Sequence, residues 1–459
     1  MTPEVGGQRG AMRRELRELI RLAGPIAAAH VGFILLGAVD TAVVGRIGET
    51  ELGAVGLGNA VFFAFALFGM GAVLGVDPLI TQALGAGQPR RARVVMWQGV
   101  WLVAALSLPL MLVTSLTTTL LESCGIEPVT AQQASAYVNA RLAALPPIML
   151  FAVLRAYLQA HTVTRPMVVG TVVANLLNLP LDWLLVFGDR GLERIGLPAL
   201  GMPAFGVVGA GLTSTIVTYV QVVVVIVAAR TTGGDQVVSR APVKALLAKA
   251  VRLGWPIGLQ RFAEMGLFSL TGVLMGTIGT VAVAAHQVAM TLASATFMVP
   301  LGISAAAAVR VGRAVGAGDQ RGARQAGLAS VGLGGSFMAV CAVLLMAFPR
   351  PLAAVLTDQP QIIEAARPLL MVAALFQISD GLQSVASGIL RGMGDTKWML
   401  GVNLAGHYVI GMPLGILLAF AVGIGAVGLW WGLCAGLTTV AVALLLRFQF
   451  LSARPVERV

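Results

Sequence analysis

Long runs of apolar residues, separated by short polar segments, dominate the chain. A helix that spans a membrane needs about 20 mainly apolar residues. Twelve runs meet this requirement, and each predicts a transmembrane helix. They cover residues 19–44, 52–84, 94–121, 134–158, 167–188, 204–229, 251–277, 280–309, 326–348, 362–390, 398–421 and 426–450.

The composition agrees with this pattern and excludes two broad classes of protein. Of the 459 residues, 57% are hydrophobic and only 11% are charged. Soluble domains carry about 25% charged residues, and disordered chains are poor in apolar residues. The sequence therefore predicts an all-α integral membrane protein.

The positions of the basic residues predict how the chain is oriented in the membrane. The chain has 31 Lys and Arg residues and a net charge of +11. If the N-terminus is cytoplasmic, 24 of them fall in cytoplasmic segments and six on the opposite side, which follows the positive-inside rule. We therefore expect both termini to be cytoplasmic. The excess charge serves orientation, so we expect no nucleic-acid partner.

The second half of the chain repeats the first. Arg21-Leu-Ala-Gly-Pro-Ile matches Arg252-Leu-Gly-Trp-Pro-Ile at an offset of 231, and the same offset aligns residues 84–93 with 315–324. Six spans per half give both halves the same orientation, so we predict twelve transmembrane helices in two parallel-repeat six-helix bundles. The bundles would be 1–229 and 251–459, joined by a cytoplasmic linker, 230–250. Transporters commonly have such repeats and bind substrate between them, although channels and membrane enzymes remain alternatives here.

Four acidic residues are predicted to lie inside these spans: Asp40, Asp182, Glu264 and Asp380. An ionised carboxylate at membrane depth costs at least ~2.5–3.5 kcal/mol, and such groups commonly bind protons or cations. Spacing groups Asp40 with Asn178 and Asp182 in the first bundle and Glu264 with Asp380 in the second. Two oxygen-rich clusters would suit H⁺ or a hard cation such as Na⁺.

Each acid also has a purely structural interpretation. Asp40 and Asp182 would lie near the lipid headgroups if their spans were shifted, because both are toward one end. Glu264 would pair with Arg261, three residues earlier on the same helical face. Asp380 would cap a kinked helix through its own backbone.

Other polar residues add less. Gln287, next to His286, is a candidate substrate contact or half of a hydrogen-bonded core pair, and Asp77 is expected at the membrane interface. The three cysteines and four histidines show no metal or redox spacing. Gly423-Ile-Gly425-Ala-Val-Gly428 fits the dinucleotide-binding pattern, but no βαβ unit surrounds it, so we interpret it as helix packing. No Walker or hydrolase motif is present, so we expect neither an enzyme nor a cofactor.

Several segments, taken in order, resemble the NorM-like branch of the multidrug and toxic compound extrusion (MATE) family. The resemblance covers essentially the whole chain. It rests on Val39-Asp40-Thr41, Leu52-Gly-Ala-Val-Gly-Leu-Gly-Asn59, Leu84-Gly-Ala-Gly87, Asn178-Leu-Pro-Leu-Asp182, Gly206-Val-Val-Gly-Ala-Gly211, Gly254-Trp-Pro-Ile-Gly258, Ala284-Ala-His-Gln-Val-Ala289, Asp380-Gly-Leu-Gln-Ser384 and Leu390-Arg-Gly-Met-Gly-Asp-Thr396.

This resemblance implies a secondary active exporter of organic, often cationic compounds, driven by antiport with H⁺ or Na⁺ through alternating access. It implies a multi-pass protein of the bacterial inner membrane, and we expect it to be a monomer surrounded by lipid. The implied cation-coupling residues are Asp40, Asn178, Asp182, Ser214, Glu264 and Asp380, with Glu264 and Asp380 as possible Na⁺ ligands. The expected substrate contacts are Asp40, Glu264, Gln287 and Asp380.

A flippase for lipid-linked precursors is the main alternative. Such a protein would need a strongly cationic cavity for a pyrophosphate. Arg261 is the only basic residue that the sequence clearly places inside the membrane, which disfavours this alternative.

Overall fold

The computed structural model describes residues 3–459 except 122, 124, 195, 197, 235, 236 and 456, and it leaves undescribed the side chains of 3–9 and 11. Cys124 therefore lies outside the described residues. Every regular element in the described part is a helix. The α-helices are α1 (Pro3–Val44), α2 (Glu49–Val73), α3 (Val76–Gly85), α4 (Pro89–Thr119), α5 (Pro128–Arg141), α6 (Leu145–Ala160), α7 (Arg165–Phe187), α8 (Asp189–Arg194), α9 (Val207–Thr231), α10 (Lys244–Ile278), α11 (Thr280–Ala317), α12 (Gln320–Ala347), α13 (Pro349–Ala354), α14 (Pro360–Met393), α15 (Thr396–Leu404), α16 (Met412–Ile416) and α17 (Ala426–Ser452).

The predicted all-helical membrane fold is confirmed. Eleven helices or helix pairs among the described residues are long and apolar enough to cross a membrane. The predicted seventh span is α10, a helix of 35 residues that does not reach the same apolarity, because it carries Arg261 and Glu264. Its first residue is Lys244, so the segment predicted as a linker, 230–250, includes the first turns of this helix.

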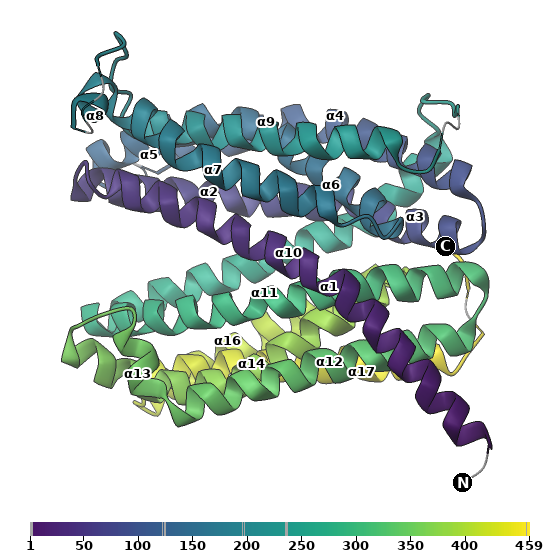
Figure 1. Cartoon of the computed structure of the whole chain (residues 1–459). Coiled ribbons are helices and arrows are strands. Elements are labelled where there is room, and N and C mark those ends of the chain that lie inside the picture. Colours follow the sequence, from purple (N-terminus) through teal and green to yellow (C-terminus); the bar gives the residue numbers. More distant parts are fainter. Residues whose placement is uncertain are drawn as a thin grey trace. The chain divides into compact units, whose positions relative to one another are not determined.

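The contacts divide the chain into two compact units (Figure 1). The N-terminal unit comprises Ala29–Val76 and Arg90–Gly258, and the C-terminal unit comprises Met1–Ala28, Asp77–Pro89 and Leu259–Val459. This division differs from the linear one at 229 and 251, because α1 and α10 each contribute residues to both units. Within the N-terminal unit α7 packs extensively on α9, and within the C-terminal unit α11 packs on α14.

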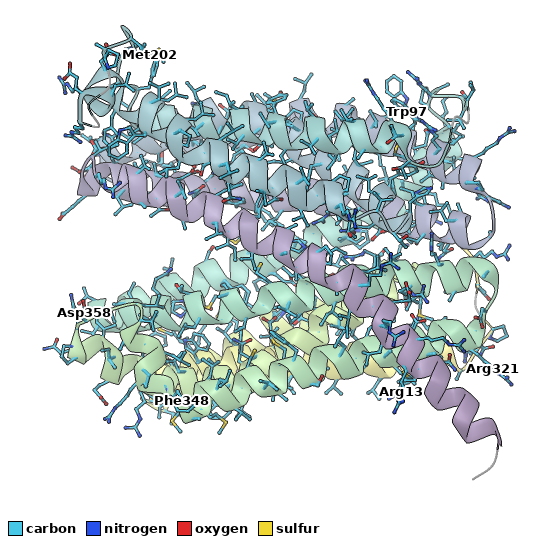
Figure 2. The ribbon with its side chains drawn as sticks, viewed as in Figure 1. Arg13, Trp97, Met202, Arg321, Phe348 and Asp358 are labelled. Carbon is cyan, nitrogen blue, oxygen red and sulfur yellow. The ribbon has the colours of Figure 1, made fainter. Side chains whose placement is uncertain are left out.

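The side chains follow the charge pattern at the ends of each unit. Figure 2 places Arg13 and Arg321 at one end of the C-terminal unit, and Phe348 and Asp358 at the other. Both arginines belong to the segments that were predicted to be cytoplasmic. In the C-terminal unit these two arginines therefore lie at the end opposite to Phe348 and Asp358.

The repeated Gly-Ala-Gly motif produces the same turn in both halves. Gly87 and Gly318, related by the 231-residue offset, have φ values of +71° and +74°, which only glycine adopts readily. Gly318 ends α11 in a left-handed cap. The next residue, Asp319, starts α12 by accepting a 2.8 Å hydrogen bond from the Gly322 amide. The motif is therefore a helix stop followed by a helix start.

The same motif also brings two repeat-related helices together within the C-terminal unit. A Cβ atom on Gly85 of α3 would overlap the backbone of Arg313 in α11, and one on Gly316 would overlap the backbone of Gln82 in α3. Gly316 is the repeat equivalent of Gly85, and Arg313 is the repeat equivalent of Gln82, because each lies 231 residues further along the chain. This reciprocal contact indicates local two-fold pseudosymmetry between α3 and the end of α11.

A carboxylate outside the spans organises the loop before α9. Asp189 accepts hydrogen bonds from the backbone N–H groups of Leu200 (2.9 Å), Gly201 (3.0 Å) and Met202 (3.1 Å). These bonds, with Leu200 contributing most, lower the pKa of the Asp189 carboxyl below its ordinary value of 3.8. The loop is held by an ionised acid.

Candidate functional site

In the N-terminal unit, the four coupling residues that were predicted for the first bundle lie in one buried cluster. Asn178 and Asp182 lie four residues apart on α7 and therefore share a face. The Asn178 side-chain nitrogen donates to Asp40 of α1 (2.8 Å) and to Asp182 (3.3 Å), while the Ser214 hydroxyl of α9 donates to Asp40 (2.6 Å). The two carboxyls are at most 1% exposed.

The two carboxyls of this cluster share one hydrogen-bond donor, the side-chain nitrogen of Asn178. Carboxylates that share one site repel each other strongly when both are ionised, so a proton or a cation between them is favoured. Asp182 Oδ1 and Asn178 Oδ1 are buried and have no hydrogen-bond partner among the described residues. The cluster therefore holds buried carboxyl and amide oxygens that are not used by hydrogen bonds within the described part of the chain.

A buried arginine borders the same unit's core and was missed by the sequence analysis. Arg141, at the end of α5, donates to the Asn59 amide oxygen and to the Tyr137 hydroxyl (2.7 Å). Its guanidinium also lies 4.4 Å from the centroid of the Phe62 ring. Arg141 was among the six basic residues assigned to the non-cytoplasmic side, although it falls within the predicted span 134–158, and it is 7% exposed. The i,i+4 spacing of Tyr137 and Arg141 was the available signal.

In the C-terminal unit, Glu264 of α10 is surrounded by amide donors. Its Oε1 accepts hydrogen bonds from Gln260 (3.0 Å), Gln383 of α14 (2.9 Å) and Asn403 of α15 (2.8 Å). Arg261 approaches its other oxygen at 3.7 Å, so the predicted Arg261–Glu264 salt bridge is present. The three amides were not identified from the sequence.

Glu264 and Asp380 line one cavity of about 310 Å³. Asp380 projects from α14 and interacts electrostatically with Glu264 and Arg261. Half of the other residues that line this cavity are polar, and the apolar half includes the aromatic and methionine side chains of Met265, Phe268, Met290, Phe297 and Phe376. A pair of carboxyls in such a wall complements a cation that also has an apolar surface.

The comparisons with known proteins agree with this geometry. The MatE family matches residues 25–184 and 256–417, one segment in each half. A probable multidrug resistance protein NorM from Deinococcus radiodurans is 37% identical and covers 95% of this chain and 95% of its own length. A probable NorM from Bradyrhizobium diazoefficiens is 34% identical over 98% of this chain and 97% of its own. The chain belongs to the MATE family.

Solved structures show the same fold. The eukaryotic MATE transporter AtDTX14 superposes with a TM-score of 0.83 at 24% identity, covering 95% of this chain and 96% of that one. A MOP superfamily transporter from Pyrococcus furiosus has the same TM-score at 18% identity, with 96% of both chains covered. The predicted family, fold class and two-fold repeat of this MATE protein are therefore confirmed.

The cavity of this MATE chain also suits a small hard cation such as Na⁺. Beside the two carboxyls, Gln383 Oε1, Ser384 Oγ and Ser387 Oγ are buried oxygens with no hydrogen-bond partner among the described residues. Hard cations prefer carboxylate, carbonyl and hydroxyl oxygens. No group of three or more His, Cys, Asp or Glu residues that could hold a metal ion gathers in the described part of the chain.

Two predicted positions lie apart from this chemistry. Gln287 is exposed on α11, and it is absent from the residues that line the cavity. Asp77 was expected at the interface, but it is 6% exposed and forms a 3.0 Å ion pair with Arg391 of α14. Arg261 is therefore not the only basic residue among the packed helices. Arg141, inside the predicted span 134–158, and Arg391, one residue beyond the predicted span 362–390, are both buried.

Proposed function

We propose that this MATE protein is a secondary active multidrug exporter that exchanges organic, often cationic compounds for H⁺ or Na⁺ by alternating access. The observation that carries the proposal is the presence of carboxyl pairs in both units, one of them in an aromatic cavity. The names of the relatives, multidrug resistance proteins, support this substrate class.

In the C-terminal unit, the proposed roles follow from the contacts. Glu264 and Asp380 supply the negative charge that attracts a cationic substrate, and they also supply oxygens for a coupling ion. One site cannot hold two cations at low cost, so binding of the ion favours release of the drug. A coupling free energy of ~1–3 kcal/mol between the two ligands is typical and sufficient.

In the N-terminal unit, Asp40 and Asp182 form the second proposed coupling site. Asn178 bridges the two carboxyls and Ser214 fixes Asp40. When a proton or Na⁺ binds or leaves, the repulsion between the two carboxyls changes. The packing of α1, α7 and α9 around them therefore depends on whether the coupling ion is bound. Asp40 is also proposed to contact substrate, as Gln287 is on α11.

The proposed setting is the bacterial inner membrane, with both termini cytoplasmic and the protein acting as a monomer. The proposed bundles are 1–229 and 251–459, with 230–250 as the cytoplasmic linker. The flippase alternative is not favoured, because the relatives are NorM proteins and because two carboxyls in the cavity of the C-terminal unit would repel a pyrophosphate.

The proposal is tested in a bacterial host that lacks its own drug exporters. We expect Asp40→Asn, Glu264→Gln and Asp380→Asn each to abolish ethidium efflux while the protein accumulates normally in the membrane. Glu364→Gln is the matched control, since Glu364 is an exposed acid with 53% side-chain exposure. Normal efflux in all three acid variants would refute the proposed role of these carboxyls.

A further inference from the structure

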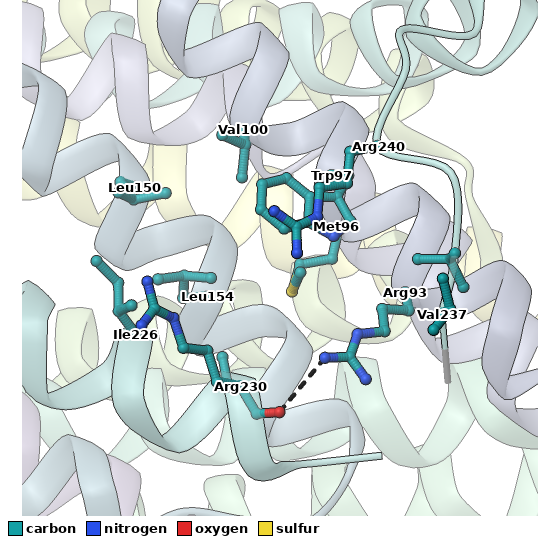
Figure 3. Close-up of a pocket in the computed structure, with 12 residues that line it drawn as sticks. Arg93, Met96, Trp97, Val100, Leu150, Leu154, Ile226, Arg230, Val237 and Arg240 are labelled. Carbon is teal, nitrogen blue, oxygen red and sulfur yellow. Dashed lines mark hydrogen bonds between the residues drawn. The ribbon is translucent and has the colours of Figure 1, made fainter. Parts of the chain in front are cut away.

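A second and larger cavity, of about 750 Å³, lies wholly within the N-terminal unit and has a different chemistry (Figure 3). We call it the arginine pocket. Among the described residues that line it there are three arginines, one tryptophan and no acid. The lining residues are Arg93, Met96, Trp97, Val100, Leu150, Leu154, Ile226, Ala229, Arg230, Val237, Val238 and Arg240.

The positive charges of the arginine pocket are positioned by contacts with the backbone and with a ring. Arg93 donates to the carbonyl oxygens of Gly234 (2.6 Å) and Arg230 (3.3 Å); Figure 3 marks the second bond. The Arg240 guanidinium lies 4.8 Å from the centroid of the Trp97 ring. Neither arrangement neutralises a guanidinium, so the described lining of the pocket is positively charged.

The pocket is polar at one end of the helices and apolar deeper in the span. Arg93 is in the second turn of α4, which begins at Pro89, and Arg230 is next to the last residue of α9. Two turns further along α4, Val100 faces the same cavity, as does Leu150 of α6. The ends of spanning helices lie at the level of lipid phosphates, and the middle lies among the acyl chains.

The segment that closes the pocket is held to α4 by hydrogen bonds. Gln98 donates to the Ala241 carbonyl oxygen (3.1 Å) and accepts from the Val243 amide (2.8 Å). The Trp101 indole nitrogen donates to the Arg240 carbonyl oxygen (2.8 Å). Gln98 is completely buried, so this wall exists before any ligand binds and little ordering cost remains.

We propose that the arginine pocket binds an anionic phospholipid. Its phosphate lies between Arg93, Arg230 and Arg240, and an acyl chain runs along the apolar wall toward Val100 and Leu150. Guanidinium groups match phosphate oxygens in geometry and charge. The apolar wall distinguishes a lipid from a free phosphate, which would leave most of this wall in contact with water.

The test compares lipids that differ only in charge or in chain length. Native mass spectrometry of the purified full-length protein measures binding of dioleoyl phosphatidylglycerol, dioleoyl phosphatidylcholine and dihexanoyl phosphatidylglycerol, with inorganic phosphate as a competitor. We expect the first lipid to bind at least tenfold more tightly than the other two, and phosphate not to displace it. Equal binding of all three lipids, or displacement by phosphate, would overturn the proposal.

A pair of variants assigns the binding to this pocket. Arg230→Gln combined with Arg240→Gln should weaken binding of the long-chain anionic lipid about tenfold or more, as expected for two lost charges near a lipid phosphate. Arg165→Gln, an exposed arginine of the same unit that does not line the pocket, should change it less than twofold. Unchanged binding in a folded double variant, or equal losses in both proteins, would contradict this assignment.

Discussion

Glu264→Gln removes one negative charge from the cavity of the C-terminal unit while preserving the shape of the side chain. A round cavity of about 310 Å³ has a radius of about 4 Å, so a bound cation lies about 4–8 Å from the Glu264 carboxylate. At an effective dielectric constant near 20, a unit charge at these distances contributes about 4 to 2 kcal/mol. The variant should therefore bind an organic cation about 30- to 1,000-fold more weakly.

The positive charge of Arg261 further weakens cation binding in the Glu264→Gln variant. Arg261 lies 3.7 Å from Glu264, and without this partner its positive charge repels a cation in the cavity. The measurement is the Kd of tetraphenylphosphonium for the protein in lipid nanodiscs at low ionic strength. Glu364→Gln, the same substitution at an exposed position, should leave the Kd within threefold. A Glu264→Gln protein that is folded and binds the probe as tightly as the unmodified protein would refute the electrostatic reasoning.

Three further predictions concern single positions. Arg261→Gln removes a positive charge from the same cavity, so it should tighten binding of tetraphenylphosphonium; weaker binding would show that Arg261 supports the site structurally. Gly316→Val places a side chain against the backbone of α3 and should cost about 1–3 kcal/mol of stability, seen as a lower Tm. Gly332→Val on α12 has open space around it and should not change the Tm. Asp189 holds its loop while ionised, so the protection factors of the three bonded amides, taken relative to the intrinsic exchange rate at each pH, should fall as the pH falls below about 4 through the lowered pKa. Asp189→Asn should show low protection at every pH, and unchanged protection would contradict this.

The parts of the fold that depend on local pattern could be predicted from the sequence. Apolar runs of sufficient length identify the helices, because the membrane requires every backbone group to be paired within its own segment. The repeat at 231 residues was readable because Pro25 and Pro256 mark equivalent helices. The prediction missed the contributions of α1 and α10 to both units. The apolar pattern of a helix does not indicate which other helices that helix contacts.

Residues alone made the buried acids of the candidate site predictable, and the family resemblance added Ser214. Carboxyls inside apolar runs are conspicuous, so Asp40 and Glu264 were identified directly. Amides such as Gln383 and Asn403 are cheaper to bury and do not stand out, and their contact with Glu264 joins residues 119 and 139 positions apart. Arg141 was missed because it lies near the start of the predicted span 134–158 and was assigned to the non-cytoplasmic side. A position near the end of a span does not reveal burial.

The claim on which the account depends is that an ion gradient drives export through the buried carboxyls. The most direct measurement uses purified protein in liposomes, with a pH gradient and a Na⁺ gradient imposed separately, and follows tetraphenylphosphonium transport together with the counter-flow of the ion. The account predicts that one of these gradients drives transport against the substrate gradient, and that Asp40→Asn and Glu264→Gln abolish it. Transport of equal rate with both gradients collapsed, or undiminished in both variants, would contradict it.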